Sequence, residues 1–179
     1  MENKKDSLKR DEFSIFLHGT LVRIFEKGVL IRGDSSSGKS SLAFELIKRG
    51  HLFIADDLVK ITKNKSQELI GSSPNAEKLI EIRPFGIFDV EEIFNKEAIQ
   101  ETQKIDFVVD FSEKEKTNCT IFNIICKQYF IDFSCQQERV NYIEKIALLQ
   151  GKENKFLVKK NSNNQRKKVE DSKNCLCEK

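Results

Sequence analysis

A glycine-rich loop at residues 33–41 carries the residue types that bind phosphate. Its sequence, GDSSSGKSS, has the spacing G-x-x-x-x-G-K-S and lies between an apolar run and a helix-like run. Glycines let backbone N–H groups approach phosphate oxygens, and a following helix adds a partial positive charge. The alternative is an ordinary Ser/Gly-rich loop that caps a helix. We expect a nucleotide-binding loop formed by Gly33, Asp34, Ser35, Ser36, Ser37, Gly38, Lys39, Ser40 and Ser41.

Within this loop two side chains have predicted roles of their own. Lys39 would reach the β- and γ-phosphates of a nucleotide, and the Ser40 hydroxyl would complete the coordination of Mg²⁺. The loop therefore predicts a nucleotide triphosphate and Mg²⁺ as ligands.

Two adjacent carboxylates, Asp56 and Asp57, follow at the end of the apolar run HLFIADD. We expect them at the carboxyl edge of a parallel sheet, beside the phosphate loop. One carboxylate could hold Mg²⁺ directly or through water, and the other could take a proton from an attacking hydroxyl. The alternative is that the two acids only begin a solvated turn.

The surrounding elements predict an α/β fold: a P-loop nucleotide-binding core with a mixed, strand-rich sheet around one strand–loop–helix unit. Leu42, Ala43, Leu46 and Ile47 recur at helical spacing, and Gly50 is a natural helix end. The expected strands are two within residues 13–26, a buried one at 29–31, the run at 51–55, a hairpin turning at 64–66, and runs at 105–111, 119–126 and 129–133. A last amphipathic helix is expected at 138–149.

Composition fits a cytoplasmic globular protein. The chain has 179 residues, 39% hydrophobic and 33% charged. No apolar run reaches the roughly 18 residues of a membrane-spanning helix, and MENKKDSLKRDE at the start has no signal-peptide core. We therefore expect no membrane partner. We also expect neither a disulfide nor a metal cluster from the five cysteines, including Cys175 and Cys177.

Charge and composition divide the chain into three segments. We expect a disordered N-terminus at residues 1–12, a P-loop domain at 13–150, and a basic, disordered tail at 151–179. The tail holds nine Lys and Arg against four Asp and Glu and lacks apolar periodicity. Nucleic-acid binding through QRKK is the alternative for the tail. Because the body is not basic, we expect no nucleic-acid partner.

Several stretches resemble the catalytic domain of bacterial HPr kinase/phosphorylase, the P-loop enzyme that phosphorylates a serine of the phosphocarrier HPr. They are LHGTLVRIFEKGVLIRGDSSSGKSSLAFELIKRGH, ADD, ELIGSSP and KLIEIRPFGIFDV, in the family's order and at nearly its spacing. The last is similar to the family's own signature. The resemblance implies an ATP- and Mg²⁺-dependent serine kinase of an HPr-type carrier, which regulates the phosphotransferase system and carbohydrate metabolism. It also implies a reverse phosphorylase activity and a hexamer.

The resemblance assigns roles to individual residues. His18 matches an active-site histidine, and Asp57 matches the carboxylate that acts as base in phosphorylation and as acid in the reverse reaction. Asp56, its neighbour, is assigned to Mg²⁺. Glu81 matches a second Mg²⁺ ligand, and Arg83 in the same signature could offset charge on the transferring phosphoryl group. Without the resemblance, Glu81 and Arg83 would be interpreted as a surface ion pair.

The chain also departs from the family pattern. Ser41 replaces an acid that often follows the loop serine, and Pro84 replaces a flexible glycine. No room for the family's N-terminal domain precedes residue 13, and neither its Asp-Arg pair nor its basic loop is recognisable after residue 111. A short catalytic core is therefore expected. The alternatives are a P-loop kinase with another substrate and a regulator that binds ATP without turnover.

Overall fold

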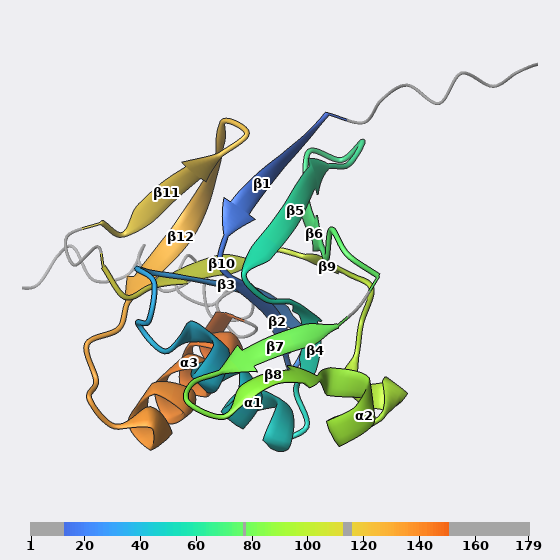
Figure 1. Cartoon of the computed structure of the whole chain (residues 1–179). Helices are drawn as coiled ribbons and strands as arrows, with labels where there is room; N and C mark the ends of the chain where they lie inside the picture. Colours follow the sequence, from blue (N-terminus) through green and yellow to red (C-terminus); the bar gives the residue numbers. More distant parts are fainter. Residues whose placement is uncertain (1–12, 77, 113–115, 151–179) are drawn as a thin grey trace, which may run out of the picture.

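The computed structural model describes residues 13–76, 78–112 and 116–150 of the chain. It has three layers, with helices on one face of a central sheet and a second sheet on the other (Figure 1). The predictions for residues 1–12 and 151–179, including Cys175 and Cys177, lie outside the described residues.

The central sheet places the phosphate loop and the two acids at one edge. Its strand order is β11-β12-β10-β3-β2-β4. Strand β3 pairs in parallel with β10, and β10 pairs in parallel with β12, whereas β2 is antiparallel to both β3 and β4. Hence β3 and β4 run in the same direction and end at the same edge. The strands are β2 (Thr20–Ile24), β3 (Lys27–Arg32), β4 (Leu52–Ala55), β10 (Phe107–Asp110), β11 (Asn118–Ile121) and β12 (Ile124–Phe130).

Alternating apolar residues let the central sheet bury both faces. Val22, Val29 and Val109 join one cluster with helices α1 (Lys39–Lys48) and α3 (Gln136–Gln150). Leu21 and Leu30 join the other cluster, which packs against the second sheet. This alternation follows from the two-residue period of a strand. The second sheet has the order β1-β5-β6-β9, formed by β1 (Ser14–His18), β5 (Leu58–Lys63), β6 (Leu69–Ser72) and β9 (Thr102–Lys104).

A separate hairpin, β7 (Leu79–Ile82) and β8 (Gly86–Asp89), lies against α1 (Figure 1). Ile80 and Ile82 are buried in the helix-side cluster, whereas Glu81 between them is exposed. The alternation therefore turns Glu81 outward while its neighbours anchor the strand. Helix α2 (Val90–Phe94) and the short 3-10 helix η1 (Lys96–Ala98) follow the hairpin.

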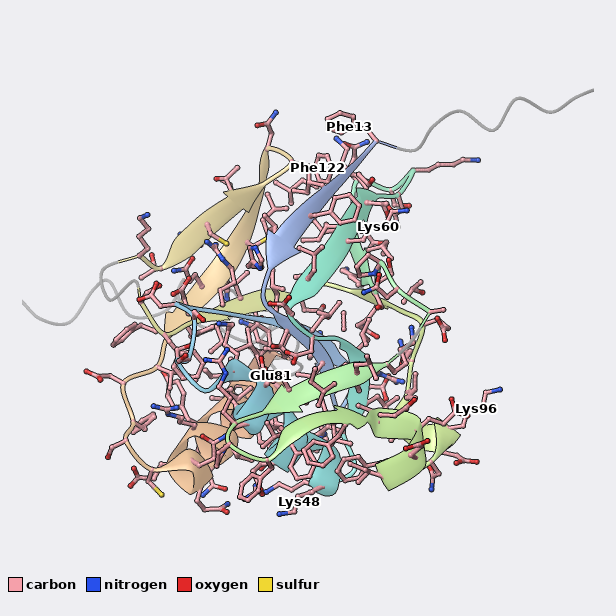
Figure 2. All side chains as sticks on the ribbon, viewed as in Figure 1. Phe13, Lys48, Lys60, Glu81, Lys96 and Phe122 are labelled. Atoms are coloured by element: carbon pink, nitrogen blue, oxygen red, sulfur yellow. The ribbon has the colours of Figure 1, made fainter. Side chains whose placement is uncertain are left out.

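The predicted α/β class and mixed, strand-rich architecture are confirmed, with two corrections. The runs 119–126 and 129–133 are not the two strands expected, because Phe122 and Asn123 adopt positive φ (52° and 61°) and form a two-residue turn between β11 and β12. Strand β12 then continues from Ile124 to Phe130, where it ends. The Phe122 ring packs edge-on against Phe13 at 5.6 Å, which offers a reason for a phenylalanine in that turn (Figure 2). Asp56 does follow β4 near the loop, but β4 joins the central sheet through an antiparallel pairing with β2, so this edge belongs to a mixed sheet and not to a parallel one.

Candidate active site

The phosphate loop connects the end of β3 to the start of α1. Gly33 (φ 145°) and Gly38 (φ 93°) lie in the left-handed region that favours glycine. Gly38 is the N-cap of α1 and supplies no side-chain cap, so the first N–H groups of the helix have no side-chain partner at this position. The Lys39 ammonium donates to the carbonyl oxygens of Gly33 (3.0 Å) and Asp34 (2.7 Å), so it lies across the loop.

A cavity of about 530 Å³ opens over this loop and collects most of the predicted residues. Its volume is in the range of small-molecule sites in proteins. Asp34 instead lines a smaller neighbouring cavity of about 240 Å³, which shares His18 and Gly33 with the larger one. Ser37 is not among the lining residues of either cavity. The larger cavity is lined by His18, Gly33, Ser35, Ser36, Gly38, Lys39, Ser40, Ser41, Asp56, Asp57, Glu81 and Arg83.

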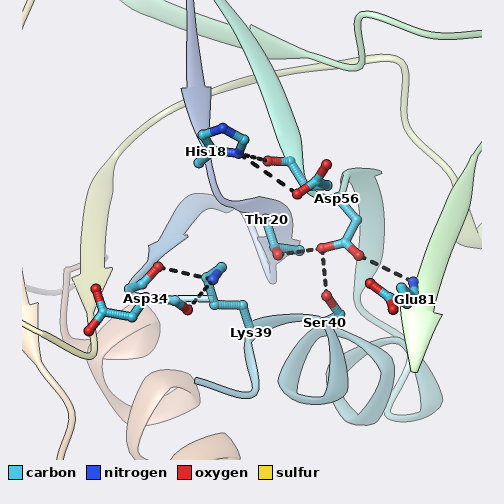
Figure 3. Close-up of polar contacts among 9 residues, drawn as sticks. His18, Thr20, Asp34, Lys39, Ser40, Asp56 and Glu81 are labelled. Carbon is cyan, nitrogen blue, oxygen red and sulfur yellow. Dashed lines mark hydrogen bonds and ion pairs between the residues drawn. The ribbon is translucent and has the colours of Figure 1, made fainter. Parts of the chain in front are cut away.

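Asp56 is held by hydrogen bonds to both of its carboxylate oxygens (Figure 3). Oδ1 accepts from the hydroxyls of Thr20 (2.6 Å) and Ser40 (3.0 Å), and Oδ2 accepts from the Glu81 N–H at 3.4 Å. The Thr20 side chain is fully buried at the start of β2. Sequence reasoning missed Thr20, because a threonine within an apolar strand has no motif of its own.

Asp57 occupies a strained turn beside His18. It has a φ of 64°, and the Leu58 N–H donates to the Asp56 carbonyl at 2.8 Å across it. The Asp57 carbonyl oxygen in turn accepts from the Gly19 N–H (3.1 Å) and lies 3.2 Å from His18 Nδ1. The two side chains stand 3.8 Å apart, and both are largely exposed. Positive φ in a non-glycine residue is concentrated at functional sites.

Glu81 and Arg83 reach the loop from the tip of the β7–β8 hairpin. Arg83 Nε donates to Glu81 Oε1 at 3.0 Å, and Nη1 donates to the Ser36 hydroxyl at 2.9 Å. The hydrogen bond and charge of Glu81 raise the pKa of Arg83 further above its ordinary value. Glu81 and Arg83 therefore form an exposed ion pair and also line the cavity.

The oxygen atoms around Asp56 are suited to a hard divalent cation. Ser40, Asp56 and Glu81 provide one hydroxyl and two carboxylates, and Mg²⁺ takes oxygen ligands while keeping several waters. In the described part of the chain, no group of three or more His, Cys, Asp and Glu side chains is placed to hold a metal ion. A cation here would therefore take its remaining ligands from water or from phosphate.

The chain has an α/β fold in which a phosphate loop, an Asp pair and a Glu-x-Arg hairpin line one cavity. These features define it as a P-loop protein. Residues 12–174 match the family model described as the HPr Serine kinase C-terminal domain. The chain belongs to this family.

Among the described residues, no helix is both long enough and apolar enough to span a membrane.

Curated relatives agree with the family. An HPr kinase/phosphorylase of Lachnoclostridium phytofermentans is 46% identical over 100 residues, covering 55% of this chain and 32% of that protein. One of Listeria monocytogenes is 49% identical over 96 residues, covering 53% and 31%. This chain thus spans about a third of the length of these relatives.

A solved structure has the same fold. The Hpr(Ser) kinase/phosphatase from Coxiella burnetii superposes with a TM-score of 0.69 at 24% identity, covering 86% of this chain and 99% of that one. This confirms the predicted fold from a source independent of the motifs.

Proposed function

We propose that the chain is an ATP- and Mg²⁺-dependent serine kinase that phosphorylates an HPr-type phosphocarrier. The observation that carries the proposal is the convergence of Lys39, Asp57 and Arg83 on one cavity, although they lie on three different elements. Family membership and the names of the relatives support the carrier as substrate.

Asp57 is the proposed base. Its side chain is 90% exposed at the cavity, where an incoming hydroxyl can reach it. The serine oxygen forms a bond to the γ-phosphorus while the bond from that phosphorus to the bridging oxygen of the nucleotide breaks. The serine proton passes to Asp57, so the serine hydroxyl must lie within hydrogen-bond reach of the Asp57 carboxylate. His18 contacts the Asp57 main chain and holds this turn in place.

The other residues hold and neutralise phosphate. Lys39 leaves the loop carbonyls to bind the β- and γ-phosphates, and Arg83, whose Nη1 donates to the Ser36 hydroxyl of the loop, offsets charge on the transferring group. Ser40, Asp56 and Glu81 would hold Mg²⁺. When bound, the ion offsets negative charge on the phosphate oxygens. Thr20 keeps the Asp56 carboxylate oriented toward Ser40.

A phosphorylase activity is a separate part of the proposal. Protonated Asp57 can donate to the serine oxygen while inorganic phosphate attacks the phosphorus of phosphoserine, so that the bond from phosphorus to the serine oxygen breaks and free serine and pyrophosphate form. A hexamer, a cytoplasmic location and a role in carbohydrate metabolism remain predictions that follow from the family.

The test is phosphate transfer from ATP to an HPr-type carrier encoded in the same genome, followed by mass spectrometry of the carrier. We expect one phosphoserine that requires Mg²⁺ and is lost when the carrier's acceptor serine is replaced by alanine. Consumption of ATP without phosphorylation of the carrier would favour a kinase with another substrate. Binding of ATP without turnover would favour a regulator.

A further inference from the structure

Arg139 reaches the phosphate loop from the first turn of α3. Its Nη1 donates to the carbonyl oxygen of Ser37 at 3.2 Å, although the two residues are 102 positions apart in sequence. Its Nε donates to the Phe133 carbonyl oxygen, and its guanidinium carbon lies 4.9 Å from the centroid of the Phe111 ring. Two hydrogen bonds and one aromatic face therefore fix this side chain against the loop.

The contact with Ser37 sets the direction of one peptide unit. In a trans peptide the C=O and the N–H point to opposite sides. Because the Ser37 carbonyl is turned toward Arg139, the Gly38 N–H is turned away from it. Gly38 lines the 530 Å³ cavity, and a phosphate oxygen bound there would be within reach of a backbone N–H of the loop.

Packing and charge favour the same arrangement. A Cβ atom at Gly38 would lie 3.1 Å from Arg139 Nη1, so the glycine allows the guanidinium to approach closely. Arginine is always protonated in proteins, and this positive charge lies at the N-terminus of α1. It adds to the partial charge of the helix end that attracts anions.

We propose that Arg139 is a positioning residue for nucleotide binding, which holds the Ser37 carbonyl and thereby presets the loop to present the Gly38 N–H to phosphate. The identity of the ligand as ATP rests on the proposed function. The preset conformation of the loop does not, and it can be measured without a nucleotide.

Arg49 provides a matched control at the other end of α1. Its Nη1 donates to Glu144 (2.7 Å) and Asn141 (3.1 Å) of α3. Both arginines therefore connect the α1 region to α3, but Arg49 donates to side chains of α3, whereas Arg139 donates to Ser37 of the phosphate loop. Loss of Arg49 weakens the contact between the helices without touching the phosphate loop.

The experiment compares Arg139→Ala, Arg139→Lys and Arg49→Ala in the full chain. One measurement is the Kd for ATP with Mg²⁺, and the other is hydrogen–deuterium exchange of amides 33–40 without nucleotide. We expect Arg139→Ala to weaken ATP binding about tenfold and to speed loop exchange, because a charge-assisted hydrogen bond is lost. Arg139→Lys should recover part of both effects, and Arg49→Ala should change neither.

The proposal is overturned if Arg139→Ala exchanges like the wild type, or if Arg49→Ala speeds loop exchange equally. Should Arg139→Ala fail to fold, Arg139→Lys decides by the same comparison. A wild type that does not bind ATP would refute the proposed function, while the exchange comparison would still decide the role of Arg139.

Discussion

At the scale of single residues, Asp56 and Asp57 are neighbours with different surroundings. Asp56 accepts three hydrogen bonds within the protein, whereas the Asp57 side chain is 90% exposed at the cavity. A carboxylate that is already held in place suits a cation ligand, and one that is open to solvent suits proton transfer to a substrate. The surroundings therefore divide the proposed roles in the same way as the resemblance does.

Thr20→Val tests the support beneath Asp56. Valine keeps the shape of threonine but removes the hydroxyl that donates to Oδ1 at 2.6 Å. Because hydrogen bonds to charged groups contribute about 1.5–3 kcal/mol, we expect the free energy of unfolding to fall by about that amount. The magnesium concentration for half-maximal activity should also rise. Thr62→Val in β5 is the control, and an equal loss in both variants would contradict this role for Thr20.

Cys119 should react with alkylating reagents at lower pH than Cys126. A hydrogen bond with the neighbouring Cys126 side chain, and then the charge of Arg32, lower the pKa of Cys119 to about 7. The same hydrogen bond raises the pKa of Cys126. Because the thiolate is the nucleophile, labelling of Cys119 should rise with pH through about 7. Mass spectrometry of iodoacetamide-treated protein from pH 6 to 9 measures this.

The Cys126→Ala variant is the control for the labelling of Cys119. Cys126→Ala removes the hydrogen-bond partner of Cys119, so half-maximal labelling of Cys119 should move up toward the ordinary pKa of about 8.5. Equal labelling of both thiols in the wild type at neutral pH would contradict the assignment.

At the scale of elements, the two sheets meet where β3 crosses β9. A Cβ atom at Gly28 would lie 1.8 Å from the Lys104 carbonyl oxygen, and Gly28 also exchanges hydrogen bonds with Asp106. Strand β9 is paired with β6, so this carbonyl cannot easily move away. The close approach of the two backbones therefore requires glycine here.

Gly28→Ala should destabilise the fold by about 3 kcal/mol or more, because overpacking displaces paired backbone. Urea unfolding followed by circular dichroism measures the loss. Gly50→Ala is the comparison. Gly50 has φ 89° but no atom within 4 Å of the added Cβ, so only backbone strain of about 1–2 kcal/mol is expected there. A loss at position 28 no larger than at position 50 would contradict the steric argument.

Local sequence patterns predict the elements nearest the loop well. The helix expected from the helical spacing of Leu42 and Leu46, with Gly50 after its end, is α1 (Lys39–Lys48). The turn at Phe122 was missed, since neither turn residue is a glycine and its packing partner Phe13 is distant in sequence. Thr20 and Arg139 were missed for a related reason. Their contacts span 36 and 102 positions, which no local pattern encodes.

At the scale of the whole molecule, both apolar clusters are built from residues between 21 and 147 in the described part of the chain. The tail at 151–179 holds nine Lys and Arg against four Asp and Glu and lacks apolar periodicity, so we expect the predicted domain at 13–150 to fold without it. We expect a chain truncated after residue 150 to unfold cooperatively within a few degrees of the full chain, measured by thermal circular dichroism. The family match continues to residue 174, so a truncated chain that is unfolded would extend the domain boundary to that point.

The whole molecule brings the end of β3, the end of β4 and the β7–β8 hairpin to one cavity. If phosphoryl transfer takes place in this cavity, the binding of ATP and the chemical step can be tested with different residues. We assign Asp57 to the chemical step and Lys39 to the binding of ATP.

The most direct test is therefore transfer of labelled phosphate from ATP to an HPr-type carrier by the wild type and by Asp57→Asn, with the Kd for ATP measured in parallel. Loss of a positioned base costs about 10²–10⁴-fold in rate. We expect Asp57→Asn to lose transfer by that factor while its Kd for ATP changes less than about threefold, since the side chain is not a proposed phosphate ligand. Transfer at the wild-type rate by Asp57→Asn, or no transfer by the wild type, would contradict the role of Asp57 as the base in a kinase.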